Sequence, residues 1–311
     1  ELITLEPTVT SSGPGQLSTW SKHIVRRAHN ECTVTPLPAS AWNPLEADAT
    51  TIAGMFSEPL MVLAEGVVPA FVLRGAYPEK DCQALMERFE ARGYFRRETV
   101  GAESQLSGGS YLDLGTSLGR MGADRKAFFA HAERTHALFP RLFEGLADPV
   151  ATIYRNLFAL AAGKQVRTAV STDGRLYGPA IFRIYQSEEG HRPHYDSVRR
   201  RSTSNYEVAR FAHQFAGVLC VKKGSVGGDS VLHRAKAEGE VEDVLGRGEF
   251  EPYARDQDIP SVRVELDAGD LYFFYTENVH EVPRTERADM RVVLAVFIAM
   301  SPDDKEIYVW S

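Results

Sequence analysis

Two histidines and an aspartate, His194, Asp196 and His280, are the residues of this chain whose types and order could do chemistry. Two imidazoles and one carboxylate form the facial triad that holds non-haem Fe(II) and leaves positions open for reactants. Arg291 follows His280 and opens an apolar run. A guanidinium there could pair with the far carboxylate of a 2-oxo acid bound to the metal. These four residues are therefore a candidate iron centre.

The pattern His-x-acid occurs more than once, so context has to separate the matches. They are His29-Asn30-Glu31, His131-Ala132-Glu133 and His194-Tyr195-Asp196. Residues i and i+2 point to the same side of a strand but about 200° apart on a helix. The second match lies in a predicted helix, and the first has no downstream strand partner. Only the third match lies in extended-looking sequence after a predicted strand and a glycine turn.

A third ligand has to come from a distant strand. His280 follows an aromatic stretch, Leu271 to Tyr275, that a Gly-Asp turn introduces. Arg291 begins the next predicted strand, and a buried arginine is costly unless it meets a carboxylate. A bound 2-oxo diacid would supply that carboxylate.

The elements that must position these residues change character along the chain. Helical periodicity predicts helices over about 78–93, 123–143 and 149–162. Short strands are predicted at 67–73, 180–185, 215–221, 230–233, 261–266, 271–275 and 291–300. We expect an α+β fold with a mainly β core, a double-stranded β-helix (jelly roll) packed with N-terminal helices. Residues 1–65 are expected to form an arm and extension. Residues 66–311 form the expected domain, with helices over about 78–162 and the jelly-roll core over about 163–311.

Composition narrows the class of protein. The chain has 311 residues, a net charge of −7 and a pI of about 5.8, which argues against a nucleic-acid binder. No apolar run reaches the roughly 18 residues of a membrane span. Three scattered cysteines fit neither a disulfide framework nor a thiolate metal site, and a cytoplasmic setting is expected. We expect a monomer or homodimer that acts on a small molecule, with no nucleic-acid or membrane partner.

These motifs together resemble the Fe(II)/2-oxoglutarate-dependent oxygenases. The stretch Tyr185 to Asp196 is similar to the prolyl 4-hydroxylase branch. A free-standing group that oxidises small natural products, which includes the hapalindole-type halogenases, is closer still. That likeness runs from about Phe71 to Trp310 and includes the turns Gly227-Gly228 and Ala268-Gly269-Asp270.

The resemblance implies a ligand set and two co-substrates. His194, Asp196 and His280 would hold Fe(II) and act through it, while Arg291 would bind the distal carboxylate of 2-oxoglutarate, with O2 as the second co-substrate. Halogenases of the group have a small residue where Asp196 stands, so the aspartate favours a hydroxylase. Many relatives place Ser or Thr two residues after the arginine. This chain lacks one there, and Tyr185 is the candidate replacement.

The substrate is predicted only by class. The run Arg199-Arg200-Arg201 could be a solvated loop or could recognise an anion, so Arg199, Arg200 and Tyr195 are candidate substrate contacts. Oxidation of an unactivated C–H bond of a carboxylate-bearing amino-acid-derived or alkaloid natural product is the leading hypothesis, by hydroxylation, desaturation or a kainoid-type oxidative ring closure. The alternatives are a prolyl-type peptide or protein hydroxylase and a non-catalytic metal-binding jelly roll.

Overall fold

Two sheets carry the candidate site, one large and one small. The computed structural model describes residues 23–28, 31–36, 42–101, 103–107, 111–186, 188–201, 203–224, 228–285 and 290–311. The chain divides into two units, Glu1–Ala41 and Trp42–Ser311. In the first unit, β1 (His23–Ala28) and β2 (Glu31–Pro36) pair as an antiparallel hairpin. Residues 1–22 of the expected arm and extension, and His29 and Asn30 of the first His-x-acid match, lie outside the described residues.

The second unit contains every element discussed below. Its strands are β3 (Leu45–Glu46), β4 (Ala70–Leu73), β5 (Gln105–Ser107), β6 (Leu112–Gly115), β7 (Gln165–Thr168), β8 (Ile181–Gln186), β9 (His191–His194), β10 (His213–Lys222), β11 (Ser230–Lys236), β12 (Ser261–Val264), β13 (Leu271–Tyr275), β14 (Asn278–Val282), β15 (Met290–Met300) and β16 (Glu306–Trp310). Its α-helices are α1 (Ala49–Met55), α2 (Pro59–Ala64), α3 (Glu79–Ala91), α4 (Leu118–Met121), α5 (Arg125–Phe143), α6 (Pro149–Leu160), α7 (Glu240–Arg247) and α8 (Phe250–Asp256), and its 3-10 turns are η1 (Arg97–Thr99), η2 (Val198–Arg200) and η3 (Glu207–Arg210).

The large sheet has the strand order β3-β4-β13-β10-β15-β8-β6-β5, with β16 and β7 joined through β15. The small sheet has the order β12-β11-β14-β9. Leu232 and Val264 of the small sheet pack in one apolar cluster with Val218 and Val293 of the large sheet. The two sheets therefore face each other, and the predicted jelly-roll core is confirmed.

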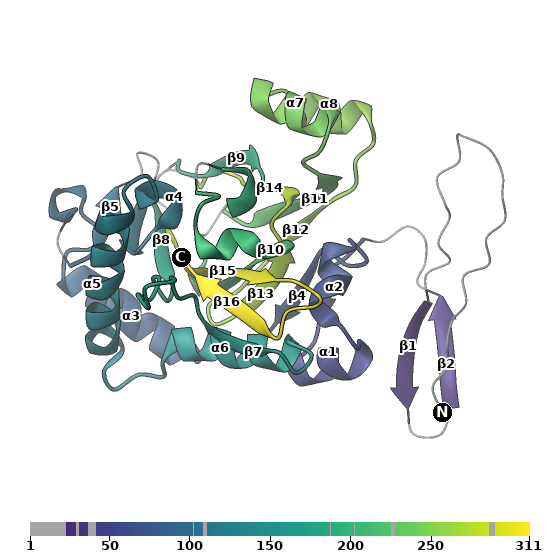
Figure 1. Cartoon of the computed structure of the whole chain (residues 1–311), viewed down its shortest axis with the longest axis horizontal. Coiled ribbons are helices and arrows are strands. Elements are labelled where there is room, and N and C mark those ends of the chain that lie inside the picture. The colour runs from purple at the N-terminus through teal and green to yellow at the C-terminus, as the bar shows by residue number, and fades with distance from the viewer. Residues whose placement is uncertain are drawn as a thin grey trace. The chain divides into compact units, whose positions relative to one another are not determined.

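Helices cover the other face of the large sheet, as Figure 1 shows for α3, α5 and α6. Alternation along β8 explains the two faces. Phe182 and Ile184 are fully buried in the cluster that contains helix residues such as Phe89 and Leu142. The intervening residues of β8 point to the small sheet. The α+β arrangement expected from helices first and strands afterwards is thus confirmed.

The predicted helices begin where the sequence places a cap. Asp124 accepts a hydrogen bond from the Ala127 amide at 3.0 Å at the start of α5. Asp148 does the same for two amides at the start of α6, with Pro149 in the first turn. Such caps satisfy amide groups that lack a partner within the helix.

Several elements were not predicted from the sequence. Strands β9 and β14, which carry two candidate ligands, are short and mix polar residues with proline or charge, so neither shows hydrophobic alternation. The helices α7 and α8 are inserted between β11 and β12 (Figure 1). Residues 42–65, which add α1 and α2 to the core, belong to the second unit. The predicted boundary between the extension and the domain at residue 65 stays a prediction. Among the described helices, none is both long enough and apolar enough to cross a bilayer.

Candidate metal centre

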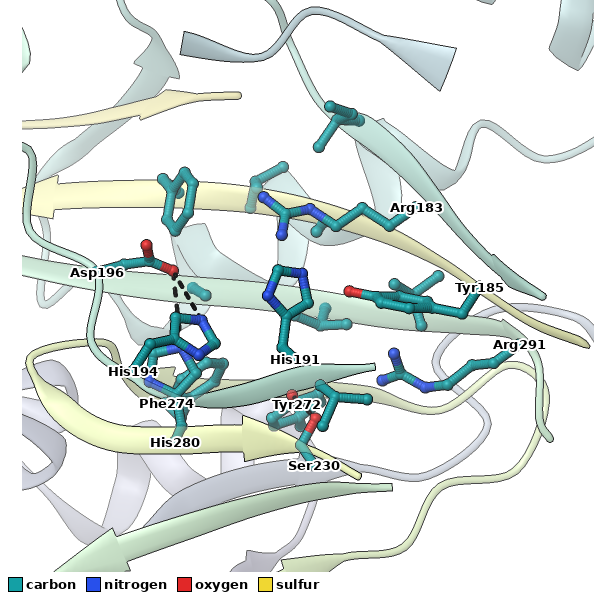
Figure 2. Close-up of a pocket in the computed structure, with 18 residues that line it drawn as sticks. Arg183, Tyr185, His191, His194, Asp196, Ser230, Tyr272, Phe274, His280 and Arg291 are labelled. Atoms are coloured by element: carbon teal, nitrogen blue, oxygen red, sulfur yellow. Dashed lines mark hydrogen bonds and ion pairs between the residues drawn. The ribbon is translucent and has the colours of Figure 1, made fainter. Parts of the chain in front are cut away.

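Pairing of β9 with β14 brings the two histidines together. His194 and His280 are directly opposite in the ladder, and their ring centroids lie 4.3 Å apart. Asp196 follows β9 and is fixed by its backbone, because its amide donates to the Thr276 carbonyl at 2.9 Å and its carbonyl accepts from the Thr276 hydroxyl at 2.8 Å. The ligand atoms of all three residues lie within 4.8 Å of one another. The structure thus assembles the predicted ligands at one point (Figure 2).

The hydrogen bonds of the imidazoles leave the correct nitrogen for a metal. His194 Nδ1 lies 2.7 Å from the Arg192 carbonyl, and His280 Nδ1 lies 2.9 Å from the Asn278 carbonyl. A carbonyl only accepts, so each Nδ1 carries the hydrogen and each Nε2 keeps its lone pair. Both Nε2 atoms face Asp196 Oδ2, at 3.8 and 3.6 Å. Such backbone contacts orient metal-binding histidines.

The charges at the centre also suit a divalent cation. Burial alone would raise the pKa of Asp196, but the hydrogen bond with His280 and the charges of His194 and Arg201 outweigh it and lower the pKa well below its usual value. Burial, together with the charge of His280, lowers the pKa of His194 to about 4. At neutral pH the carboxylate is ionised and this imidazole is neutral, which are the forms that bind metal. The donor set therefore fits Fe(II).

Arg201 was not singled out within its basic run, yet it contacts the centre directly. Its Nη2 lies 2.6 Å from Asp196 Oδ1 and donates to the Tyr195 carbonyl at 3.0 Å. Oδ2 of Asp196 faces the histidines, so the arginine holds the other oxygen. Arg201 can therefore fix which oxygen of Asp196 is presented to a metal.

The triad opens into a cavity between the sheets, and Arg291 lies on its far side (Figure 2). Arg291 is only 5% exposed and is paired across the ladder with Tyr185, its guanidinium carbon 5.3 Å from the centre of the tyrosine ring. Within the described part of the chain its guanidinium has no hydrogen-bond or ion-pair partner. Burial raises the pKa of Tyr185 to about 12, so its hydroxyl stays protonated. These two side chains can together receive a carboxylate.

Gly228 leaves the space that Arg291 occupies. A Cβ atom at this position would lie 3.0 Å from Arg291 Cδ and 3.2 Å from Thr285 Cγ2. The glycine also has φ +77°, in the left-handed region. Gly228 of the predicted Gly227-Gly228 turn therefore leaves room for the Arg291 side chain, while Gly227 lies outside the described residues.

The three candidate substrate contacts are engaged elsewhere. Arg199 donates to the Ala212 carbonyl at 2.6 Å. Arg200 pairs with Glu242, and Tyr195 donates to the same carboxylate at 2.9 Å. None of Arg199, Arg200 and Tyr195 lines the cavity that the triad opens into. Their contact with a substrate stays a prediction.

The cavity contains polar side chains that the sequence did not reveal. They are Arg183, His191 and the pair formed by Tyr272 and Ser230, whose hydroxyls lie 2.7 Å apart. Arg183 shares its face of β8 with Tyr185, so alternation from the tyrosine could have identified it. The competing motif at His131 behaves as predicted for a helix, because His131 is buried in α5 while Glu133 is exposed.

Comparison with known proteins identifies the family of the chain. A model of the family described as carrier-protein-independent halogenase WelO5 matches residues 42–311. An N-substituted L-amino acid dioxygenase from Burkholderia ambifaria AMMD is structurally similar, with a TM-score of 0.54, 14% identity, and coverage of 93% of this chain and 98% of that one. The same dioxygenase in complex with alpha-KG gives a TM-score of 0.50, 16% identity and the same coverage. At this identity the likeness concerns the fold. No curated protein is significantly similar in sequence.

Proposed function

The chain belongs to the family of the carrier-protein-independent halogenase WelO5 and is an Fe(II)/2-oxoglutarate-dependent oxygenase, and we propose that it oxidises an unactivated C–H bond of a small, carboxylate-bearing molecule derived from an amino acid or alkaloid. Hydroxylation and a desaturating or ring-closing oxidation are both outcomes of hydrogen removal at such a site. The observation that carries the proposal is the position of Asp196.

Asp196 separates an oxygenase from a halogenase. A halogenase needs a coordination position for its halide. Here the Asp196 carboxylate occupies the third corner of the triad, with its oxygen 3.6 and 3.8 Å from the two histidine nitrogens. Its ionised form and its pairing with Arg201 keep it in that corner. This geometry supports oxygenation rather than halogen transfer by this member of the family.

We assign the following roles to the residues of the chain. His194, Asp196 and His280 would hold the iron, which with 2-oxoglutarate and O2 supplies the oxidant that removes hydrogen from the substrate. Arg291 would bind the distal carboxylate of 2-oxoglutarate, and the Tyr185 hydroxyl would donate to it. Tyr272 and Phe274, both buried on strand β13 of the large sheet, would exclude water from the cavity.

The first experiment tests the metal and its co-substrate. Anaerobic addition of Fe(II) and 2-oxoglutarate to the full chain should give a weak visible charge-transfer band. The double variant Asp196→Ala/His280→Ala should lose the band. Absence of the band in the wild type, or its survival in the double variant, would refute the iron assignment.

The second experiment tests the class of substrate. Succinate release is measured over a panel of amino acids, N-alkyl and N-acyl amino acids and proline-rich peptides, with chloride present throughout. We expect stimulation by a small carboxylate-bearing compound and an oxygenated, desaturated or cyclised product. A chlorinated product, or turnover confined to the peptides, would contradict the proposal.

A further inference from the structure

A second arginine enters the cavity, on the side of the metal centre. Arg183 lies two residues before Tyr185 on β8, so both side chains point to the small sheet. Its guanidinium extends toward the Asp196 side of the cavity, above the His191 ring in Figure 2. Arg291 approaches from the neighbouring strand at the other side (Figure 2). The cavity is therefore flanked by two cationic groups, of which the proposed function uses only one.

Arg183 is half-buried, and its charge has no ion-pair partner among the described residues. Its Nε is inaccessible to solvent and has no acceptor among the described residues, where the guanidinium also makes no ion pair. Aromatic rings surround it instead, with Tyr111 and Phe297 centred 5.6 and 6.0 Å from the guanidinium carbon. Aromatic faces offset part of the cost of burying a cation, but they satisfy no N–H group. An arginine in this state is suited to receive an anion from outside the chain.

The nearest acid does not neutralise Arg183. Asp113 stands directly opposite it on β6 and is fully buried. That carboxylate pairs with Arg120, whose Nε lies 3.1 Å from Asp113 Oδ2. Burial raises the pKa of Asp113 to about 6, although both arginines oppose the shift. Two guanidiniums thus share one carboxylate, and the cluster keeps an excess of positive charge beside the cavity.

The other facing groups do not supply a negative charge either. His191 lines the cavity, its Nε2 has no described partner, and an imidazole carries no negative charge. The Asp196 carboxylate pairs with Arg201 and faces the two metal-binding histidines. An imidazole and a guanidinium without an ion-pair partner therefore meet at the metal side of the cavity.

We propose that Arg183 is a second carboxylate-binding residue of the cavity, separate from Arg291, that holds a carboxylate beside the metal centre. The inference rests on the proposed function. Two sources share this chemistry: the carboxylate of the oxidised substrate, and the metal-chelating carboxylate of 2-oxoglutarate. The Arg120–Asp113 pair lies beside Arg183 on the same face of the sheet and does not itself line the cavity.

The experiment uses the full chain with Fe(II) under anaerobic conditions and has one arm for each source. In the first arm, the Kd of 2-oxoglutarate is measured from the charge-transfer band. In the second, calorimetry with the Fe(II)–2-oxoglutarate complex compares N-acyl L-amino acids with their primary carboxamides. Arg183→Met is compared with Arg183→Lys and with Arg167→Met, an arginine of β7 that pairs with Glu306 outside the cavity.

We expect Arg183→Met either to raise the Kd of 2-oxoglutarate at least tenfold or to remove a preference of at least tenfold for binding the acids over the amides. The arm that changes identifies the source. Arg183→Lys should keep part of the effect, and Arg167→Met should match the wild type in both arms. Because Arg183 has no described acceptor in the chain, Arg183→Met should melt at or above the wild-type temperature without ligands.

Three results would overturn the proposal. One is an Arg183→Met variant with wild-type affinity for 2-oxoglutarate and an unchanged acid-over-amide ratio. Another is a wild type that binds the acids and the amides equally well, together with a Kd of 2-oxoglutarate that Arg183→Met leaves unchanged. The third is a large fall in melting temperature, which would assign Arg183 to the core. A missing band in the wild type would instead refute the proposed function, so the two failures are distinguishable.

Discussion

Replacement of Arg291 by glutamine tests the co-substrate site most directly. Arg291 is 5% exposed and has no hydrogen-bonding partner among the described residues, so a bound carboxylate would be its main partner. Removal of one member of a buried charged pair costs about 3–5 kcal/mol. Each 1.4 kcal/mol corresponds to about a tenfold change in affinity. The Kd of 2-oxoglutarate should therefore rise by at least about 100-fold in Arg291→Gln.

The folded state should tolerate this change. Because the chain loses no described hydrogen bond or ion pair, the free energy of unfolding without ligands should change by no more than about 1 kcal/mol. Arg291→Lys keeps the charge but loses the two-pronged geometry, so its Kd should lie between those of the wild type and the glutamine variant.

The assay is anaerobic titration of the Fe(II)-loaded protein with 2-oxoglutarate, followed at the charge-transfer band. Arg167→Gln is the matched control, because it removes an arginine that is 45% exposed and pairs with Glu306. A Kd for Arg291→Gln within about fivefold of the wild type would show that the distal carboxylate binds elsewhere. Unchanged affinity at Arg291 with a large loss at Arg183 would point to a reversed orientation of the co-substrate.

Three further predictions concern the shell of the site and the core. Arg201→Gln removes the 2.6 Å contact with Asp196 and should lower the Fe(II) affinity about 10–100-fold, as measured by competitive titration with a chelator. An unchanged Fe(II) affinity would reject a positioning role for Arg201. Gly228→Ala places a Cβ 3.0 Å from Arg291 Cδ in a backbone with φ +77°. It should therefore raise the Kd of 2-oxoglutarate without changing the Fe(II) affinity. A Kd of 2-oxoglutarate equal to that of the wild type would show that the arginine can move aside. Burial lowers the pKa of His131 to about 4, so protonation opposes folding, and this histidine alone should contribute about 3 kcal/mol to the stability lost as the pH falls from 6.5 to 4. Chemical denaturation should show this loss reduced in His131→Leu, and an identical pH slope in the variant would contradict the assignment.

The metal ligands were predictable because their signal combines residue type with backbone geometry. A His-x-Asp pair in extended sequence points both side chains one way, and the remaining histidine follows a distinct aromatic strand. The structure adds a reason that the sequence did not contain. His194 and His280 are direct partners in the β9–β14 ladder. Neither strand has an alternating apolar pattern, so their pairing could not be inferred from periodicity.

The residues proposed to bind carboxylates were predictable only in part. Arg291 opens an otherwise apolar strand, and that contrast made it visible. Arg183 lies in a strand whose residues are all large, so its burial against a cavity was not evident from composition. The exposed-looking run from Arg199 to Arg201 attracted attention instead. All three of its arginines donate to backbone carbonyls, and Arg201 also pairs with Asp196. Charge density in a sequence therefore does not by itself locate a cavity, since the direction of each side chain depends on the tertiary fold.

The division of the site between two sheets bears on the outcome of the reaction. The small sheet and the loop after it supply the metal ligands, and the large sheet supplies both cavity arginines. A substrate whose carboxylate is held by the large sheet would thus have a C–H bond oxidised at a metal held on the small sheet. The distance between anchor and metal is set by the residues packed between the sheets, such as Val293 and Ala295 beside β8. Which C–H bond reaches the metal, and hence whether a hydroxyl group or a ring results, should therefore depend on this packing more than on the ligands themselves.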